Sequence, residues 1–209
     1  PAPPPPDRPR STASMPPPVS AAAPPGCPDD AVEDPPGFVR PAVWELLRLR
    51  TQELRDRLPQ LSRDGSPALR QGLRGLNGDD PTRAAERIAE APDHVRDGFD
   101  VSVAALLLLG MRAIGDEDPR AAWHHARIAA GRAPDDPLPH ALASLAADRM
   151  DDPENARREM GWAVEAAPDE PALALVHARQ LAEVARYDQA VPALDRYLAA
   201  VPEDARVRS

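Results

Sequence analysis

The chain has 209 residues, of which 42% are hydrophobic but only 3% aromatic, and its formal net charge at pH 7 is −9. A hydrophobic core built from this composition consists mainly of alanine and leucine, which helices accommodate better than sheets do. All 25 basic residues are arginine, and residues 67–209 hold 17 of them against 25 acidic residues. This balance argues against a nucleic-acid-binding protein, whose affinity depends on clustered cations.

Residues 1–36 hold 14 of the 28 prolines and are predicted to form a disordered spacer. Proline fixes φ and leaves the backbone solvated, so the segment favours extended conformations and buries too little to fold. Its PPPPDRPR run at 3–10 has the composition of a ligand for an aromatic groove on another protein, which is the alternative to a spacer. Cys27 is the only cysteine, which excludes a disulfide framework and a zinc-ligand spacing.

Residues 37–65 are predicted to form an N-terminal amphipathic helix and a connector. The helix is expected from about Pro41 to Leu58, with proline in its first turn. Its apolar stripe and its charged face each hold four residues: Val43, Leu47, Leu54 and Leu58, and Glu45, Arg48, Arg55 and Asp56. We expect this helix to pack on the rest of the protein rather than to lie on a membrane surface.

From residue 66 the sequence alternates between helical segments and short breaks, and five breaks carry an acidic residue before proline. These pairs are Asp80-Pro81, Asp118-Pro119, Asp136-Pro137, Asp152-Pro153 and Glu170-Pro171. An acidic N-cap accepts a bond from an unpaired backbone N–H, and proline at the first helical position has no N–H to leave unpaired. The acidic residues are therefore interpreted as helix caps, not as catalytic carboxylates or calcium ligands.

A proline recurs at an interval of 34 residues, at Pro134, Pro168 and Pro202. Three segments end at these prolines, 103–134, 137–168 and 171–202. Small residues recur within them at matching places: Ala122 and Ala129 in the first, Ala156 and Ala163 in the second, and Ala190 in the third, where Tyr197 replaces the second alanine.

In these features the three segments resemble the tetratricopeptide repeat family. The Leu109-Gly110 pair of the first unit adds to the resemblance, and Ala143-Ser144 replaces it in the second unit. The resemblance implies an all-α fold, an α-solenoid of antiparallel helix hairpins stacked in a right-handed superhelix. Residues 102–209 are expected to form this array. Residues 66–101 match more loosely, through DPTRAA at 80–85, and are expected to form a degenerate capping hairpin.

The sequence predicts no enzymatic activity, no cofactor and no metal. His124 and His125 are adjacent, so their side chains point about 100 degrees apart on a helix and cannot chelate one ion as an i, i+4 pair could. No HExxH, GxSxG, P-loop or GxGxxG motif occurs. The histidines are interpreted as surface or partly packed residues.

The resemblance also implies a concave surface formed by the first helices of successive hairpins. The candidate partner-binding residues there are Leu107, Met111, Leu138, Leu145, Arg149, Leu175, Arg179 and Glu183. Some members of the family grip a terminal carboxylate with lysines and asparagines, whereas this chain has Ala141, Leu145 and Leu175 or Arg179 near those places. An apolar helix or an extended peptide with acidic residues is therefore the expected ligand. For Leu107 and Met111 the alternative is a place in the core.

The predicted function is that of a protein-interaction scaffold tethered by a proline-rich spacer. One alternative is an assembly module that self-associates through the ends of the array, because residues 203–209 are too few to form a closing helix. The other is a regulatory domain of a larger enzyme. The absence of lysine indicates a GC-rich, bacterial source. The longest apolar run, 103–109, is too short to insert in a membrane, and the first residue is not methionine, so both a cytoplasmic and a cell-envelope location stay open.

Overall fold

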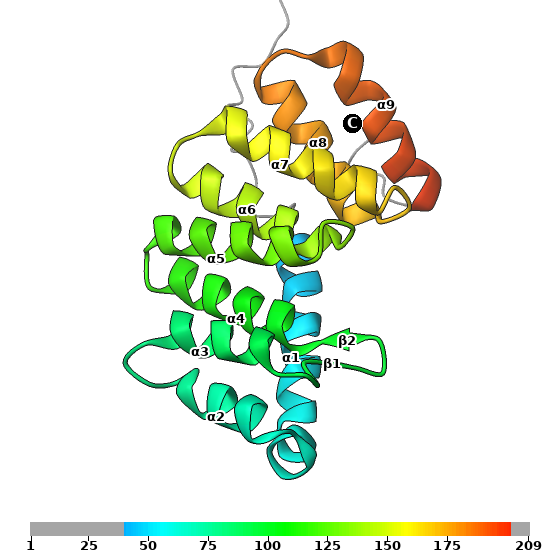
Figure 1. The fold of residues 1–209 in the computed structure, drawn as a ribbon. Coiled ribbons are helices and arrows are strands. Elements are labelled where there is room, and N and C mark those ends of the chain that lie inside the picture. The colour runs from blue at the N-terminus through cyan, green and yellow to red at the C-terminus, as the bar shows by residue number, and fades with distance from the viewer. Residues whose placement is uncertain (1–39, 202–209) are drawn as a thin grey trace, which may run out of the picture. The chain divides into compact units, whose positions relative to one another are not determined.

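A computed structural model describes residues 40–201, and Figure 1 shows that this part consists of helices and one short β-hairpin. The elements are α1 (Arg40–Asp64), α2 (Pro67–Gly75), α3 (Pro81–Glu90), β1 (Val95–Arg96), β2 (Phe99–Asp100), α4 (Val101–Gly115), α5 (Pro119–Arg132), α6 (Pro137–Arg149), α7 (Pro153–Ala166), α8 (Pro171–Glu183) and α9 (Tyr187–Ala200). The predicted spacer, residues 1–36, lies outside the described residues. No helix within 40–201 is long and apolar enough to cross a membrane.

The helices after α1 pair into four successive hairpins, α2 with α3, α4 with α5, α6 with α7, and α8 with α9 (Figure 1). The second helices α5, α7 and α9 begin at Pro119, Pro153 and Tyr187, each 34 residues after the one before. The first helices α6 and α8 begin at Pro137 and Pro171, again 34 residues apart. The predicted fold class, an α-solenoid of antiparallel hairpins, is therefore confirmed.

The acidic residues before proline cap helices as predicted. The side chains of Asp80, Asp118, Asp136, Asp152 and Glu170 each accept a hydrogen bond from a backbone N–H two or three residues further along. Each such cap contributes about 1 kcal/mol to helix stability. The caps thus fix where α3, α5, α6, α7 and α8 start, and those of α5 and α7 and of α6 and α8 keep the 34-residue period.

The turn inside each repeat unit also has a periodic conformation. Glu117, Asp151 and Ala185, which are 34 residues apart, have φ values of 61°, 58° and 57°. In each case the next residue donates its N–H to a carbonyl five residues back, as in the bond from Asp118 to Ala113 (2.8 Å). This is the left-handed termination that commonly ends an α-helix. It turns the chain from the first helix of a unit into the second.

Small residues line the contact between the paired helices. Ala122, Ala129, Ala156 and Ala163 have no exposed surface, and Ala190 is 7% exposed. A Cβ atom at Gly110 would lie 2.6 Å from Cδ2 of Leu142, so only glycine allows α4 and α6 to approach this closely without a shift of that leucine. The alanine spacing read from the sequence therefore marks helix-packing positions.

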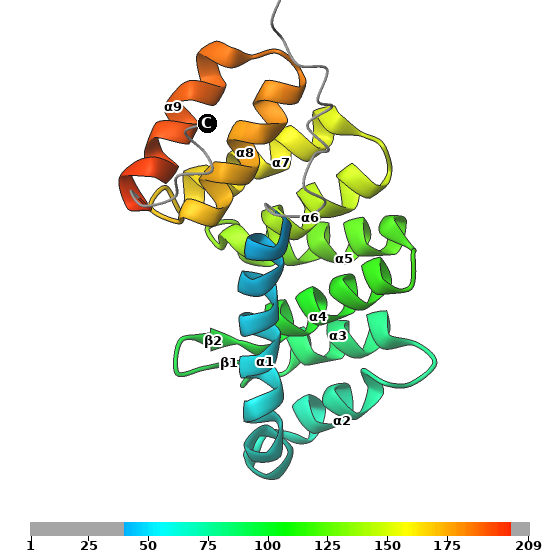
Figure 2. The same cartoon turned by 180° about the vertical axis from the view of Figure 1, so that it is seen from behind.

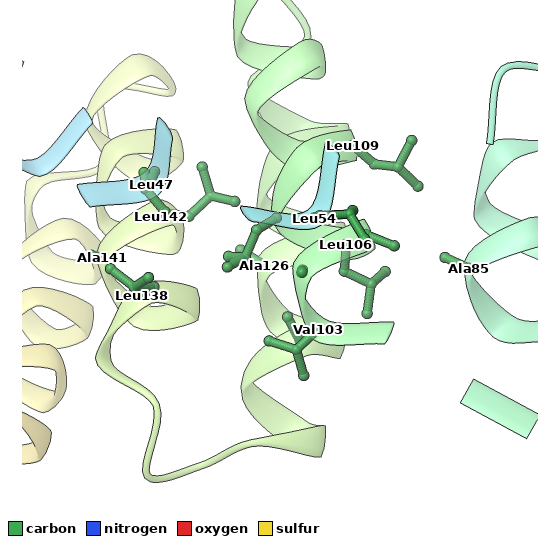
Figure 3. Close-up of a cluster of buried hydrophobic side chains, with 14 of the residues drawn as sticks. Leu47, Leu54, Ala85, Val103, Leu106, Leu109, Ala126, Leu138, Ala141 and Leu142 are labelled. Atoms are coloured by element: carbon green, nitrogen blue, oxygen red, sulfur yellow. The ribbon is translucent and has the colours of Figure 1, made fainter. Parts of the chain in front are cut away.

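Helix α1 runs across the hairpins and belongs to the core (Figure 2). It contacts α2, α4, α6 and α8, and Figure 3 shows Leu47 and Leu54 of α1 in one cluster with Leu106 of α4 and Leu142 of α6. These four leucines are at most 1% exposed. The expected packing of this helix on the rest of the protein is what the structure shows.

The predicted end of this helix at Leu58 is wrong, since α1 continues to Asp64 through Pro59. Proline removes one backbone hydrogen bond from a helix, which here frees the carbonyl of Arg55. Both Pro59 and Arg55 are exposed, so water can satisfy that carbonyl. The extra turn also buries Leu61, which is 4% exposed, and this burial favours a continued helix.

The β-hairpin between α3 and α4 was not expected. Its two strands pair through Val95 and Asp100 and through Arg96 and Phe99. The two-residue turn is Asp97-Gly98, with positive φ at both residues, which matches the twist of a short hairpin. The hairpin places Phe99 in the core at 2% exposure, with the guanidinium of Arg57 from α1 4.7 Å from its ring centroid.

Candidate functional site

The first helices α4, α6 and α8 form one face of the array, which we call the inner face. The 34-residue period aligns its positions in three sets: Ala104, Leu138 and Ala172; Leu107, Ala141 and Leu175; Met111, Leu145 and Arg179. In α4 and α6 all of these residues except Met111 are buried, whereas in α8 all three are partly exposed. Helix α1 packs across α4 and α6 and also contacts α8, and the accessible residues of the face lie on α8 and at the end of α6.

Polar contacts also hold α1 on the inner face. Nη2 of Arg50 lies 3.2 Å from Oδ2 of Asp136, the N-cap of α6. The hydroxyl of Thr51 is 3.8 Å from Sδ of Met111 and donates to the carbonyl of Arg48 at 3.0 Å. Thr51 is only 1% exposed, so its hydroxyl is satisfied within the helix and does not weaken the packing.

Four of the predicted partner-binding residues have little accessible surface. Leu107 is not exposed at all, and Leu138 and Leu145 are 8% and 7% exposed. Met111 is half-buried against Thr51 of α1. Leu107 therefore lies in the core, the alternative place for it, and Met111 is partly buried against the core.

The other four predicted residues are accessible and lie on α6 and α8. Arg149 and Glu183 are exposed, and Leu175 and Arg179 are partly exposed. Nε of Arg179 lies 2.8 Å from Oε1 of Glu183. Their part in partner binding stays a prediction, and they define the open part of the inner face.

A buried polar contact between α6 and α8 lies next to this open part of the inner face. Nε2 of Gln180 donates to Oγ of Ser144 at 2.9 Å and to Oδ2 of Asp148 at 3.4 Å. Gln180 and Ser144 are 6% and 0% exposed, so the contact fixes α8 on α6 at the place where Arg149 and Arg179 are displayed. This contact was not predicted from the sequence. Its one signal there was that Ser144, a polar residue, occupies the position that Gly110 has in the first unit.

A pocket of about 500 Å³ lies beside α1. Its walls come from α1, from the Asp97-Gly98 turn, and from the starts of α6 and α8, including Leu49, Glu53, Leu138 and Glu170. Leu49 is 53% exposed, which makes it one of the few large apolar side chains of α1 that face solvent. This pocket extends the accessible surface at the edge where α1 meets the hairpins.

A second polar cluster lies outside the inner face, between α5, α6 and α7. Glu159 is 0% exposed and binds two groups, Nη1 of Arg127 at 3.0 Å and Nδ1 of His140 at 2.8 Å. The His140 ring meets Trp162 edge-on, with 5.5 Å between centroids. The sequence contained one signal for this cluster. The positions aligned with Glu159 in the first and third units are His125 and Ala193, so only the second unit has a carboxylate at this buried position.

His124, His125 and His177 lie outside this cluster and differ in exposure. His124 is exposed, and His125 is 7% exposed. Burial lowers the pKa of His125, and the neighbouring His124 adds to this effect while Asp118 opposes it. Burial also lowers the pKa of His177, together with the charges of Arg157 and Arg196. Among the described residues no group of three or more histidine, cysteine, aspartate or glutamate side chains is placed to hold a metal ion.

No protein-family model and no curated protein matches the chain. Among solved structures it is similar to a double mutant of MamA RS-1, at 18% identity and a TM-score of 0.48, over 80% of this chain and 95% of that one. It is also similar to MamA residues 41 to the end from Desulfovibrio magneticus RS-1 (18%, 0.46, 80% and 95%) and to MamA AMB-1 (15%, 0.47, 80% and 92%).

Proposed function

We propose that the chain is a non-catalytic protein-interaction module that binds an apolar helix or an extended peptide on the open part of its inner face. The observation that carries the proposal is the packing of α1. An amphipathic helix already lies across the first helices of the hairpins, with Val43, Leu47 and Leu54 fully buried. A face that packs one amphipathic helix has the shape and apolarity to accept another beside it.

The chemistry of the open part favours an acidic ligand with apolar anchors. Leu175 supplies apolar surface, Arg179 supplies a cation one turn further along α8, and Arg149 supplies a second at the end of α6. Glu183 pairs with Arg179 at an exposed position, where an ion pair contributes at most about 1 kcal/mol. A partner carboxylate can therefore replace Glu183 at little cost. The chain itself catalyses no reaction in this proposal. If the chain is a regulatory domain of a larger enzyme, it would bind its partner through the same surface.

Photo-crosslinking with the full chain tests the proposal. Benzoylphenylalanine replaces Leu175 in one version and the exposed Arg74 of α2 in the control. The expected result in lysate of the source organism is a discrete crosslinked species at 175 and none at 74. An Arg179→Glu change should then lower the yield of that species. Equal crosslinking at both positions, or an undiminished yield with Arg179→Glu, contradicts binding on α8.

The exposed face of α9 favours a second candidate, assembly through the end of the array. Tyr187 and Val191 are 63% and 56% exposed, and Leu194 and Leu198 on the same helix are partly exposed. Exposed apolar side chains at this spacing are typical of a helix face that packs on a partner. Sedimentation velocity separates the candidates: self-association that rises with concentration and is lost in Val191→Glu supports assembly, and a monomer at all concentrations contradicts it.

A further inference from the structure

The strongest unexplained feature is a pocket of about 520 Å³ outside the inner face, between the C-terminal halves of α5 and α7. Its walls include Arg127, Gly131, Asp135, His140, Trp162 and Glu165. None of these residues belongs to the open part of the inner face. The pocket is therefore independent of the surface to which the proposed function is assigned.

The electrostatics of the pocket favour a cation. It is lined by Ala130 and Gly131 from the end of α5 and by Glu165 and Ala166 from the end of α7. The last carbonyls of a helix have no intrahelical partner and form the negative end of its dipole. Asp135 and Glu165 add two exposed carboxylates, and neither forms an ion pair with another described residue.

Among the described residues that line the pocket, the one cationic side chain, Arg127, is already paired with a carboxylate. Nη1 of Arg127 lies 3.0 Å and 3.3 Å from the two carboxylate oxygens of the buried Glu159. A buried carboxylate holds its cation strongly, because separation of the pair would leave an unpaired charge out of water. Arg127 is therefore not available to neutralise Asp135 or Glu165, and the pocket keeps an excess of negative charge.

Trp162 gives the pocket a flat aromatic wall. Its side chain is 39% exposed, and the guanidinium groups of Arg127 and Arg158 already lie 6.0 Å and 5.5 Å from its ring. The ring thus accepts guanidinium groups by cation–π attraction. His140 also meets the Trp162 ring edge-on, and the bond from Nδ1 of His140 to Glu159 fixes the histidine. The wall is consequently held in place before any ligand arrives.

We propose that this pocket binds an arginine side chain presented by an extended segment of a partner protein. A guanidinium stacks on the exposed indole surface and pairs with Asp135 and Glu165, which lie at the rim. Arginine fits better than lysine, because its planar group both stacks on an aromatic face and bonds carboxylates in a bidentate manner. An anionic ligand is disfavoured, since it would meet two carboxylates and two helix C-termini.

A titration followed by NMR tests the proposal with the full chain. The probe is the capped peptide acetyl-Pro-Pro-Arg-Pro-Pro-amide, and the matched control peptide carries citrulline, a neutral side chain of the same shape, in place of arginine. Indole N–H signals report binding, and a Trp162→Phe variant identifies the signal of Trp162. The expected result is a saturable shift of this signal with the arginine peptide, weakened by salt, and no shift with the citrulline peptide.

Variants then locate the site. Asp135→Asn combined with Glu165→Gln removes both rim carboxylates and should raise the dissociation constant about tenfold, which corresponds to about 1.4 kcal/mol. Glu86→Gln combined with Glu90→Gln removes two exposed carboxylates from α3 and should leave the titration unchanged. Both pairs are exposed, so circular dichroism is expected to show an intact fold. An equal shift with citrulline, or wild-type affinity in the rim variant, overturns the proposal.

Discussion

Arg50 of α1 forms an ion pair with Asp136, the residue that caps α6, with 3.2 Å between Nη2 and Oδ2. The same carboxyl group accepts the N–H of Leu138 through Oδ1 at 3.0 Å. One aspartate thus starts a first helix of the array and anchors the helix that lies across it. Because the Asp136 carboxyl group binds both α1 and α6, α1 is an integral part of the folded array.

Removal of a buried side chain from α1 should therefore destabilise the whole array. Leu47 has no exposed surface, and Leu47→Ala is expected to lower the free energy of unfolding by about 2–5 kcal/mol. Leu49→Ala on the same helix is the control, because Leu49 is 53% exposed and its loss should change stability by less than about 0.5 kcal/mol. Urea unfolding measures both values. Equal midpoints for the two variants would show that α1 does not pack on the inner face in solution.

The paired helices of a unit should tolerate no extra volume at their contact. Ala163 is fully buried between α6 and α7, and Ala163→Leu is expected to destabilise the protein by about 1–3 kcal/mol. Ala166→Leu, at an exposed position of the same helix, is the matched control. Thermal unfolding followed by circular dichroism separates them. A wild-type melting temperature for Ala163→Leu would mean that the repeat register is wrong.

Much of the fold could be predicted because its determinants are local and periodic. Acidic N-caps before proline and small residues at fixed places recur every 34 residues in the sequence, and the structure adds a left-handed residue after each of α4, α6 and α8 at the same interval. The β-hairpin and the last turns of α1 do not recur. Phe99 and Leu61 are held by burial against distant helices, and no local pattern encodes such contacts.

The candidate site was predictable only in part for a similar reason. The resemblance to the repeat family implied that positions 107, 111, 138 and 145 lie on the inner face, but it carried no information on what covers that face. Thr51 and Arg50 of α1 meet Met111 and Asp136 across 60 and 86 residues of sequence. The Glu159 cluster also depends on contacts between three helices. In the sequence it is indicated only by the comparison of Glu159 with the aligned residues of the other units.

The left-handed turn at Ala185 offers a stabilising substitution. Its φ of 57° places Cβ close to the backbone, a cost that glycine does not have. Ala185→Gly is expected to raise the free energy of unfolding by about 1 kcal/mol. Ala182→Gly, three residues earlier within α8, should lower it by about 1 kcal/mol, because glycine is unfavourable inside a helix. Urea unfolding of the two variants should thus give shifts of opposite sign, and shifts of the same sign would contradict this backbone assignment.

Stability should fall with decreasing pH because of two histidines. Burial lowers the pKa of His125 and of His177 in the folded protein, so the unfolded chain binds protons more readily than the folded one. This difference favours unfolding once the pH drops below about 6.5, the ordinary pKa of histidine. His125→Gln combined with His177→Gln should reduce the slope of stability against pH between about pH 7.5 and 5.5, measured by urea unfolding. His124→Gln, at an exposed position, is the control, and an unchanged slope in the double variant would contradict this origin.

The buried carboxylate of Glu159 should matter more than its exposed neighbour on α7. Arg127 and His140 both bind Glu159, so Glu159→Ala leaves the Nδ1 proton of His140 without its acceptor in the interior. The expected loss is about 3–5 kcal/mol, as for other buried pairs from which one partner is removed. Glu165→Ala, one and a half turns further along and exposed, should cost less than about 0.5 kcal/mol. Chemical unfolding gives both values, and the Trp162 indole signal should broaden or move only in Glu159→Ala, because only that change releases His140 from its place against the ring. Equal stability of the two variants would mean that the carboxylate is hydrated in solution and does not hold the wall of the proposed arginine pocket.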